Sequence, residues 1–308
     1  MKKNDINIID TTVYPKASVF YDELRSCRDR FIVPQIESLI RQFGDAYLTF
    51  LEKVLGLASV SGVSPVDAIL DYTTAFLREQ VRFQQTASYS HDSFDDVYNE
   101  VYNNSEVMEG FYLDGLLLTH PCWEIHYHIH RFFLDSFLPR CKGKKQGFEI
   151  GFGHGLYLYE LLELAGVEKV FGKDISEFSL KYASRLLTQT FSPDRLSLAI
   201  GDIQKGLDFS DVSMEFGLMS EVLEHIHGPD QALAAAKRCL RPNSPLYVVT
   251  PVNSNAVDHI TNFQSVEEIE RIVVAAGFTV AEKKIFSIKQ FQQDSNDRTE
   301  TFCAVCTA

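Results

Sequence analysis

The stretch that decides the fold is a glycine-rich segment, which reads Gly147-Phe148-Glu149-Ile150-Gly151-Phe152-Gly153-His154-Gly155. An apolar run leads into three glycines spaced two residues apart, and a helical pattern begins at Leu156. Glycine is favoured in such a loop because it tolerates positive φ and lets a ligand approach the backbone. The segment therefore predicts a strand, a tight loop and the start of a helix, in that order.

The spacing of the glycines discriminates between ligands. A dinucleotide-binding loop has the pattern G-x-G-x-x-G and places a pyrophosphate at the helix N-terminus. Gly151 and Gly153 fit its first two positions, but Leu156 stands where the third glycine is needed. The pattern E-x-G-x-G-x-G instead resembles motif I of class I S-adenosylmethionine (SAM)-dependent methyltransferases. Because SAM carries no phosphate, the loop need only fold closely around its ribose and methionine.

Length and charge narrow the class of protein. A chain of 308 residues favours one or two domains, and a net charge of −13 disfavours nucleic acid as a partner. Residues 1–5 do not resemble a signal peptide, and no stretch approaches the ~18 apolar residues of a membrane span. We therefore expect a cytoplasmic protein that acts on a small-molecule substrate, without nucleic acid or membrane as partner. A homodimer is left open.

Before the glycine-rich segment the apolar spacing is helical. Helices are expected within 18–43, 45–57, 64–83, 92–102 and 105–118, followed by a helix from Thr119 to about Leu138 that ends before Pro139. No clear strand precedes residue 118. We therefore expect an all-helical N-terminal cap over 1–118, which would hold the substrate, and a SAM-binding domain over 119–308.

After Gly155 strands and helices alternate, which predicts an α/β fold with a doubly wound, mainly parallel, Rossmann-like sheet. The expected strands are seven: 147–150, 167–174, 196–200, 216–219, 246–250, 278–288 and 300–306. The resemblance to the methyltransferases implies that the last strand is antiparallel.

The resemblance covers about residues 119–308 and is nearest to the ubiquinone-biosynthesis O-methyltransferase branch. The turn at Arg241-Pro242-Asn243-Ser244 resembles the L-(K/R)-P-G-G turn before the fifth strand, and the segment ending Ala276-Gly277-Phe278 resembles the late "aGF" segment. Two features depart from the pattern. Lys173 stands where an apolar residue is usual, and Asn243-Ser244 replaces a glycine pair.

Three carboxylates are candidates for cofactor binding. Asp174 follows Gly155 by 19 residues and could accept hydrogen bonds from the ribose hydroxyls, or cap a helix. The resemblance implies that Asp202 meets the adenine amino group and that Glu149 faces the methionine amino group. The alternatives are a turn residue for Asp202 and a locally paired strand carboxylate for Glu149. The full predicted cofactor set is Glu149, Gly151, Gly153, Gly155, Asp174, Ile175, Asp202, Ile203, Ser220 and Glu221.

A second motif, Glu221-x-x-Glu224-His225, would place three ligand-type side chains on one helix face. Together with His259 they could hold a divalent cation. The motif resembles the metal-binding E-x-x-E-H of small-RNA 2′-O-methyltransferases, in which a metal would hold a substrate hydroxyl. The alternative is that these residues shape the SAM pocket without metal.

The cluster His126-Tyr127-His128-Ile129-His130 supplies candidates for catalysis. The helix that carries it precedes the first strand, so His126 or Tyr127 is expected to contact the substrate or the methionine end of SAM. The alternative is that these side chains, with His130, fill the seam between cap and core. Aromatic faces can favour the sulfonium cation, for which the candidates are Trp123, Tyr157 and Tyr159. The predicted catalytic residues are His126, Tyr127 and Tyr157.

The sequence thus predicts a SAM-dependent methyltransferase that transfers a methyl group to a small-molecule acceptor held between cap and core. One alternative is a SAM-consuming cyclase or lyase that acts on the methionine moiety and releases methylthioadenosine. A second is a non-catalytic SAM-fold binding protein. The identity of the acceptor does not follow from the sequence.

Overall fold

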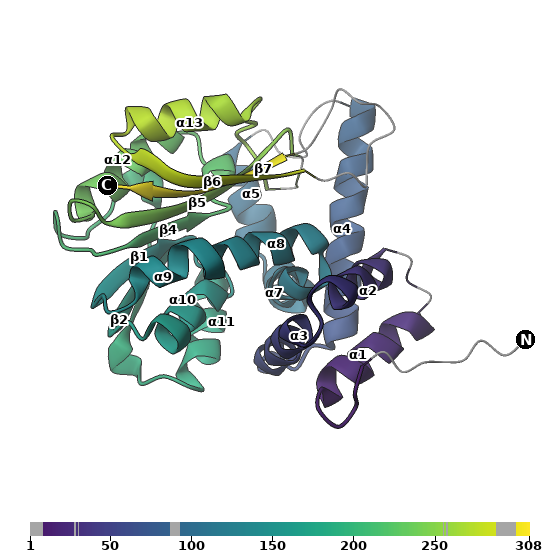
Figure 1. The fold of residues 1–308 in the computed structure, drawn as a ribbon. Coiled ribbons are helices and arrows are strands. Elements are labelled where there is room, and N and C mark those ends of the chain that lie inside the picture. The colour runs from purple at the N-terminus through teal and green to yellow at the C-terminus, as the bar shows by residue number, and fades with distance from the viewer. Residues whose placement is uncertain are drawn as a thin grey trace, which may run out of the picture.

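A computed structural model describes residues 9–27, 29, 31–86, 93–254, 256, 258–287 and 300–308, the side chains of residues 83 and 84 apart. Its centre is a seven-stranded sheet in the order β3-β2-β1-β4-β5-β7-β6 (Figure 1). Of these strands only β7 runs antiparallel to its neighbours, β5 and β6, so the predicted sheet is confirmed. The strands are β1 Gln146–Ile150, β2 Lys169–Asp174, β3 Leu196–Ile200, β4 Gly217–Ser220, β5 Pro245–Val252, β6 Thr279–Ser287 and β7 Glu300–Thr307.

Helices cover both faces of the sheet and create two hydrophobic cores. Successive side chains of a strand point to opposite faces, so Leu218 of β4 joins one core and Met219 joins the other. Strands buried on both faces read as continuous apolar runs, and all eight residues of β5 are buried. Figure 1 shows one face covered by α10 Leu156–Glu160 and α11 Glu177–Thr188, and the other by α12 Pro229–Cys239 and α13 Val266–Ala275.

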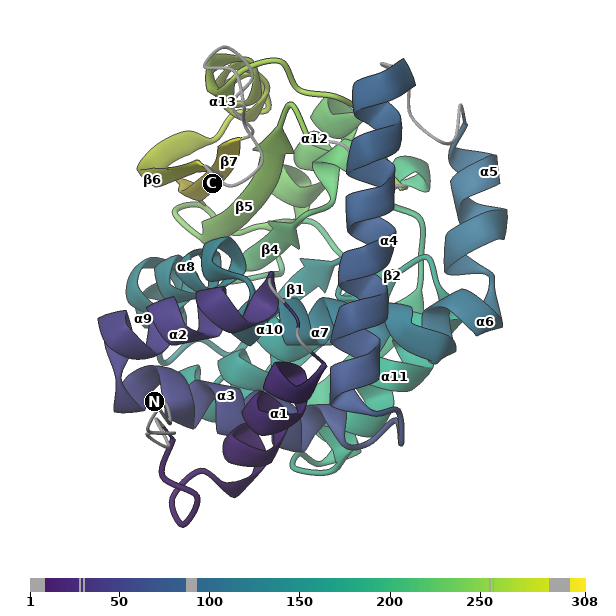
Figure 2. The same cartoon turned by 90° about the vertical axis from the view of Figure 1, so that its right-hand side faces the viewer.

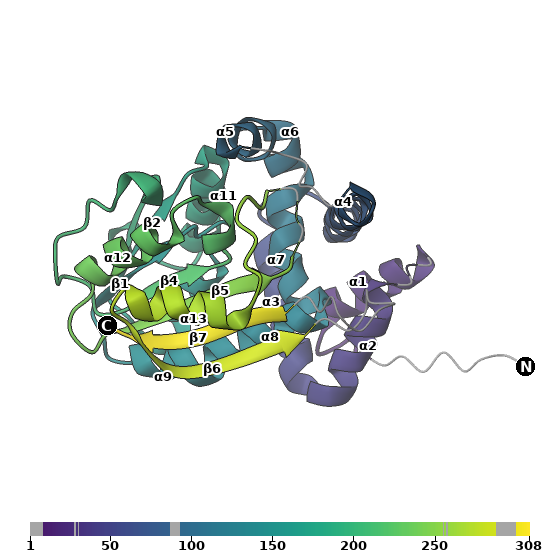
Figure 3. The same ribbon diagram turned by 90° about the horizontal axis from the view of Figure 1, so that it is seen from above.

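Every described element before β1 is helical. The longest, α4, stands across the edge of the sheet where the parallel strands end (Figures 2 and 3). In open α/β sheets ligands bind outside this edge, so the N-terminal helices face the expected site. They are α1 Pro15–Ser26, α2 Ile32–Phe43, α3 Asp45–Ala58, α4 Pro65–Thr86, α5 Phe94–Val97, α6 Ser105–Val107, α7 Leu113–Cys122, α8 Glu124–Phe132 and α9 Leu138–Cys141, with π-helical turns at Tyr98–Tyr102, Met108–Tyr112 and Phe133–Phe137.

The predicted helix from Thr119 to Leu138 is wrong at both ends. α7 continues through Thr119 to Cys122 with Pro121 in its last turn, and Trp123 is extended at φ −106° and ψ 124°. Proline has no N–H to continue the helical hydrogen bonds, so a new helix, α8, begins after Trp123. Further on, Pro139 lies in the first turn of α9, which follows directly on the π-helical turn Phe133–Phe137, so the chain stays helical past Pro139.

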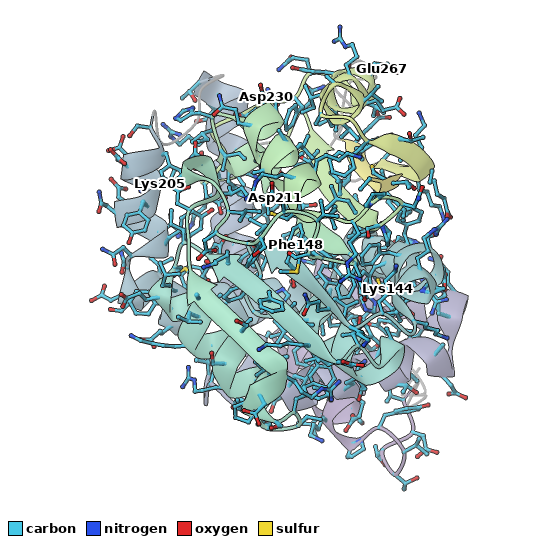
Figure 4. The ribbon with its side chains drawn as sticks, turned by 90° about the vertical axis from the view of Figure 1, so that its left-hand side faces the viewer. Lys144, Phe148, Lys205, Asp211, Asp230 and Glu267 are labelled. Atoms are coloured by element: carbon cyan, nitrogen blue, oxygen red, sulfur yellow. The ribbon has the colours of Figure 1, made fainter. Side chains whose placement is uncertain are left out.

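Two predicted boundaries, at residues 92 and 288, lie outside the described residues. None of the helices that the structure describes is long and apolar enough to cross a membrane. Figure 4 shows the face at the amino ends of the parallel strands, with Lys144 just before β1 and Asp211 before β4. The candidate site lies at the opposite edge of the sheet.

Candidate functional site

The glycine loop joins β1 to α10 in a conformation that requires glycine. Gly151, Gly153 and Gly155 have φ of 66°, 47° and 82°, which residues with a side chain rarely adopt. A Cβ atom on Gly151 would lie 2.8 Å from Val222 Cγ2, and one on Gly155 would lie 3.0 Å from Ala183 Cβ. The loop therefore packs closely against its surroundings and leaves its backbone accessible to a ligand.

Asp174, at the end of β2, organises this loop. Its Oδ2 accepts the N–H of Gly153 and its Oδ1 accepts the N–H of Ser176, each at 2.9 Å. The N-cap of α11 is Ser176, so the helix-capping alternative for Asp174 is wrong. Burial raises the pKa of Asp174 against the effect of these backbone donors. Each carboxylate oxygen keeps a lone pair, and the ribose contact stays a prediction.

Glu149 lies in β1 and is only 3% exposed. Its Oε2 has no hydrogen-bonding partner among the described residues. Burial and the charge of Asp174 raise the pKa of Glu149 well above its usual range. A positively charged partner would stabilise the ionised form of this buried carboxyl, and the methionine amino group of SAM would be one.

Asp202 follows β3 and accepts the N–H of Gln204 at 2.9 Å, while Lys205 Nζ lies 3.3 Å from its Oδ2. Asp202 therefore acts as a turn residue, which is one of the two roles predicted from the sequence. Its side chain also lines the cavity described next, so an adenine contact stays a prediction.

A cavity of about 280 Å³ lies where strand order reverses between β1 and β4, and it extends to the N-terminal helices. Ligands bind at such switch points in open α/β sheets. Trp123 lines it, as do Tyr72 and Phe76 of α4. The predicted residues that it brings together are His126, Glu149, Gly151, Gly153, Tyr157, Asp174, Ile175, Asp202, Ile203, Ser220, Glu221, His225 and His259.

Tyr127, Gly155, Glu224 and Tyr159 are not among the lining residues. Tyr127 is 1% exposed and packs at the seam, where its ring centroid lies 5.0 Å from that of Phe43 and 5.2 Å from that of Tyr47. The contact predicted between Tyr127 and the substrate is therefore wrong for this structure, because its side chain faces α2 and α3.

His130 also fills the seam. Its Nε2 lies 2.6 Å from Glu160 Oε2, and Lys53 of α3 donates to Glu160 Oε1 at 2.9 Å. The His130 ring stacks on Phe50 with centroids 4.1 Å apart. Burial raises the pKa of Glu160, but His130 and Lys53 outweigh it and hold that pKa below its usual value. This network, in which His130 and Glu160 are fully buried, joins the N-terminal helices to α10.

The predicted helix over Glu221–His225 does not form. Glu221 has φ of 54°, and only a single 3₁₀ turn, Leu223–His225, follows it. Glu221 therefore does not share a helix face with the other two side chains. The fold nevertheless brings ligand atoms of Glu224, His225 and His259 within 4.8 Å of one another.

The hydrogen bonds of this cluster fix both imidazoles. His225 Nδ1 lies 2.8 Å from the carbonyl oxygen of Asp258, and His259 Nδ1 lies 3.1 Å from that of Ser254. Carbonyl oxygens only accept, so each Nδ1 carries a proton. Such histidines fit a metal ion as well as a polar pocket wall, and the metal site stays a prediction.

Asp258, which the sequence reading missed, ties the N-terminal helices to the loop before α13. Its Oδ2 accepts the hydroxyls of Tyr102 at 3.0 Å and Tyr112 at 2.7 Å. Burial raises the pKa of Asp258, but His225, His259 and the two tyrosines outweigh it and lower that pKa. The ionised carboxylate thus holds both tyrosines at the cavity wall.

The charges of the cavity wall favour a cationic ligand. Lys173 is its only Lys or Arg among the described residues, and its Nζ is paired with Asp208 at 3.0 Å. The acidic side chains of the wall are Glu149, Asp174, Asp202, Glu221 and Asp258. SAM, with a sulfonium and an amino group, fits this wall and the close-packed glycine loop.

The strand order and the glycine loop define a Rossmann-like methyltransferase fold, and comparison with known proteins bears on its activity. Residues 148–248 match a family model described as methyltransferase domain. No curated protein matches the chain. The matched segment contains the glycine loop, Asp174 and Asp202. Residues 148–248 therefore form a methyltransferase domain, and the protein is a transferase.

The chain is also similar to solved structures. The chain is similar to the MccD protein at 15% identity and a TM-score of 0.50, over 59% of this chain and 96% of that one. It is also similar to the [4+2]-cyclase SpnF at 13% identity and a TM-score of 0.49, over 60% and 82%. A SAM-dependent methyltransferase from Archaeoglobus fulgidus shows 17% identity and a TM-score of 0.45, over 59% and 93%. Of these three, the likeness to the MccD protein supports the fold, and the fold alone.

Proposed function

We propose that the protein transfers the methyl group of SAM to a small molecule held between the N-terminal helices and the sheet. The observation that carries this proposal is that one cavity is lined both by the glycine loop and by side chains of the N-terminal helices. When bound, SAM supplies an electrophilic methyl carbon attached to a positively charged sulfur. The aromatic wall formed by Trp123, Tyr72 and Phe76 would hold the acceptor.

Each protein group has a defined task in this proposal. Glu149 binds the amino group, Asp174 the ribose, and Asp202 the adenine, as the resemblance implies. The N-terminal helices exclude water and align the acceptor, and alignment alone can supply much of the rate. Assignment to the ubiquinone-biosynthesis branch rests on the sequence motifs and belongs to the same proposal.

Calorimetry and product analysis test the proposal. The full-length protein should bind SAM and S-adenosylhomocysteine but not NAD, and Asp174→Ala should weaken SAM binding by ~1–3 kcal/mol. Incubation with SAM and a low-molecular-weight cell extract should yield S-adenosylhomocysteine. Release of methylthioadenosine would instead assign cyclase or lyase chemistry. Absence of SAM binding would overturn the proposal.

A further inference from the structure

The side chain of His126 is held by a residue that the sequence reading passed over. His126 lines the cavity in the first turn of α8, and its Nδ1 lies 2.7 Å from Thr119 Oγ1. Thr119 lies in α7, one turn before its end, and is fully buried. The contact therefore bridges the break between the two helices.

This contact decides which ring nitrogen of His126 carries the proton. Thr119 Oγ1 also lies 2.7 Å from the carbonyl oxygen of Leu116. A carbonyl oxygen has no proton to give, so that contact uses the single hydroxyl proton of Thr119. Oγ1 must then accept from His126, whose Nδ1 is protonated and whose Nε2 keeps a free lone pair.

The free nitrogen is open to the cavity. His126 Nε2 has no hydrogen-bonding partner among the described residues. The atom is accessible, and His126 lines the cavity. Burial lowers the pKa of His126 to about 4, which keeps the ring neutral near pH 7. The cavity wall therefore presents a proton acceptor at this point.

A proton donor lies on the same wall. His154 belongs to the glycine loop, and its Nδ1 accepts the N–H of Leu156 at 3.1 Å, which places the proton of the neutral ring on Nε2. Burial lowers the pKa of His154 to about 3. The ring of His120 neighbours both histidines, with its centroid 5.1 Å from that of His154 and 6.1 Å from that of His126.

We propose that the reacting group of the acceptor is a hydroxyl that donates to His126 Nε2, and that His154 Nε2–H donates to an oxygen of the same ligand. This deepens the proposed function and rests on it. His126 is then the catalytic base, and Thr119 is a positioning residue that fixes its tautomer. A hydroxyl compound suits the wall because its O–H can donate to one imidazole and a ligand oxygen can accept from the other.

The step balances within the cavity. A lone pair of the hydroxyl oxygen forms the bond to the methyl carbon, and the carbon–sulfur bond breaks with its electron pair going to sulfur. The hydroxyl proton passes to His126 Nε2. The positive charge moves from the sulfonium to the imidazolium, so the net charge of the buried site is unchanged and no new charge is created there.

Nuclear magnetic resonance of the full-length protein, with ¹⁵N-labelled histidine and saturating S-adenosylhomocysteine, tests the proposal. His126→Gln identifies the resonances. We expect a protonated Nδ1 and an unprotonated Nε2 in the wild type and in Thr119→Ser, which keeps the hydroxyl. In Thr119→Val, which has nearly the same shape, we expect a mixture of tautomers. 2-Naphthol should shift Nε2 of His126, whereas naphthalene should not.

Each part of the proposal can be overturned separately. A protonated Nε2 in the wild type would refute the base, and an unchanged spectrum in folded Thr119→Val would refute the positioning role. If 2-naphthol shifts Nε2 no more than naphthalene does, the assignment of the wall to a hydroxyl is wrong. The tautomer readout does not depend on turnover, so calorimetry with SAM tests the proposed function independently.

Discussion

Glu149 offers the sharpest test of where the cofactor lies. Its carboxyl is 3% exposed, its Oε2 is unpartnered, and burial beside Asp174 raises its pKa well above the usual range. The free protein should therefore keep a proton on Glu149 near pH 7. The amino group of SAM favours the ionised carboxylate, so binding should release that proton.

The size of the effect follows from the type of bond. A hydrogen bond between charged groups contributes ~1.5–3 kcal/mol, so Glu149→Gln should weaken SAM binding about 10- to 150-fold. Calorimetry in buffers of different ionisation enthalpy counts the protons released. His126 and His154, with pKa values of about 4 and 3, are already neutral near pH 7 and contribute nothing.

The comparison between wild type and variant isolates Glu149. Glu221 also lies at the cavity, and burial raises its pKa, so it can add to the total release in both proteins. The difference should approach about one proton per SAM. Glu163→Gln, in the π-helical turn Leu161–Ala165 and outside the cavity lining, is the matched control and should behave as the wild type. Equal affinity and equal proton release in Glu149→Gln and wild type would refute the placement.

Three further outcomes are expected. Glu160→Ala should lower the free energy of unfolding by ~3–5 kcal/mol in urea titrations, because it leaves Lys53 and His130 without their buried carboxylate, whereas Glu163→Ala should cost under about 1 kcal/mol. Folding lowers the pKa of Glu160, so the ionised carboxylate adds to the free energy of unfolding at pH values above its unfolded pKa of about 4.3. This stabilisation is lost as the pH falls through the pKa of Glu160 in the folded protein. When the free energy of unfolding is measured against pH, Glu160→Gln should lack this loss. Exhaustive chelation should leave turnover intact, because burial and Glu221 raise the pKa of Glu224 and favour its protonated form; loss of turnover that Mn²⁺ or Zn²⁺ restores would instead place a metal at Glu224, His225 and His259.

The fold could be predicted because its signals are local. The glycine loop, the carboxylate after β2 and the alternation of strands and helices are all readable over short windows. The break between α7 and α8 at Trp123 could not be predicted, because Pro121 is compatible both with the first turn of one helix and with the last turn of another. Tertiary packing decides between these two positions of Pro121, and the spacing of apolar residues along the chain does not reveal that packing.

The site was predictable only where its residues belong to the sheet. Gly151, Glu149 and Asp174 sit at strand ends, which the fold brings together. Asp258 and Tyr102 are 156 residues apart, and no local pattern indicates that they meet. His154 stood inside the glycine loop, but its role depends on His126, a residue of the N-terminal half whose orientation is set by Thr119.

The two tyrosine bonds to Asp258 also bear on the timing of the catalytic cycle. Tyr102 and Tyr112 lie in the π-helical turns on either side of α6, and Ser176 Oγ donates to the backbone oxygen of Tyr102 at 2.7 Å. A ligand that leaves between these turns and the sheet must first part the tyrosines from Asp258. We therefore expect the dwell time of S-adenosylhomocysteine, rather than the methylation step, to limit turnover, and Asp258→Asn to shorten that dwell time.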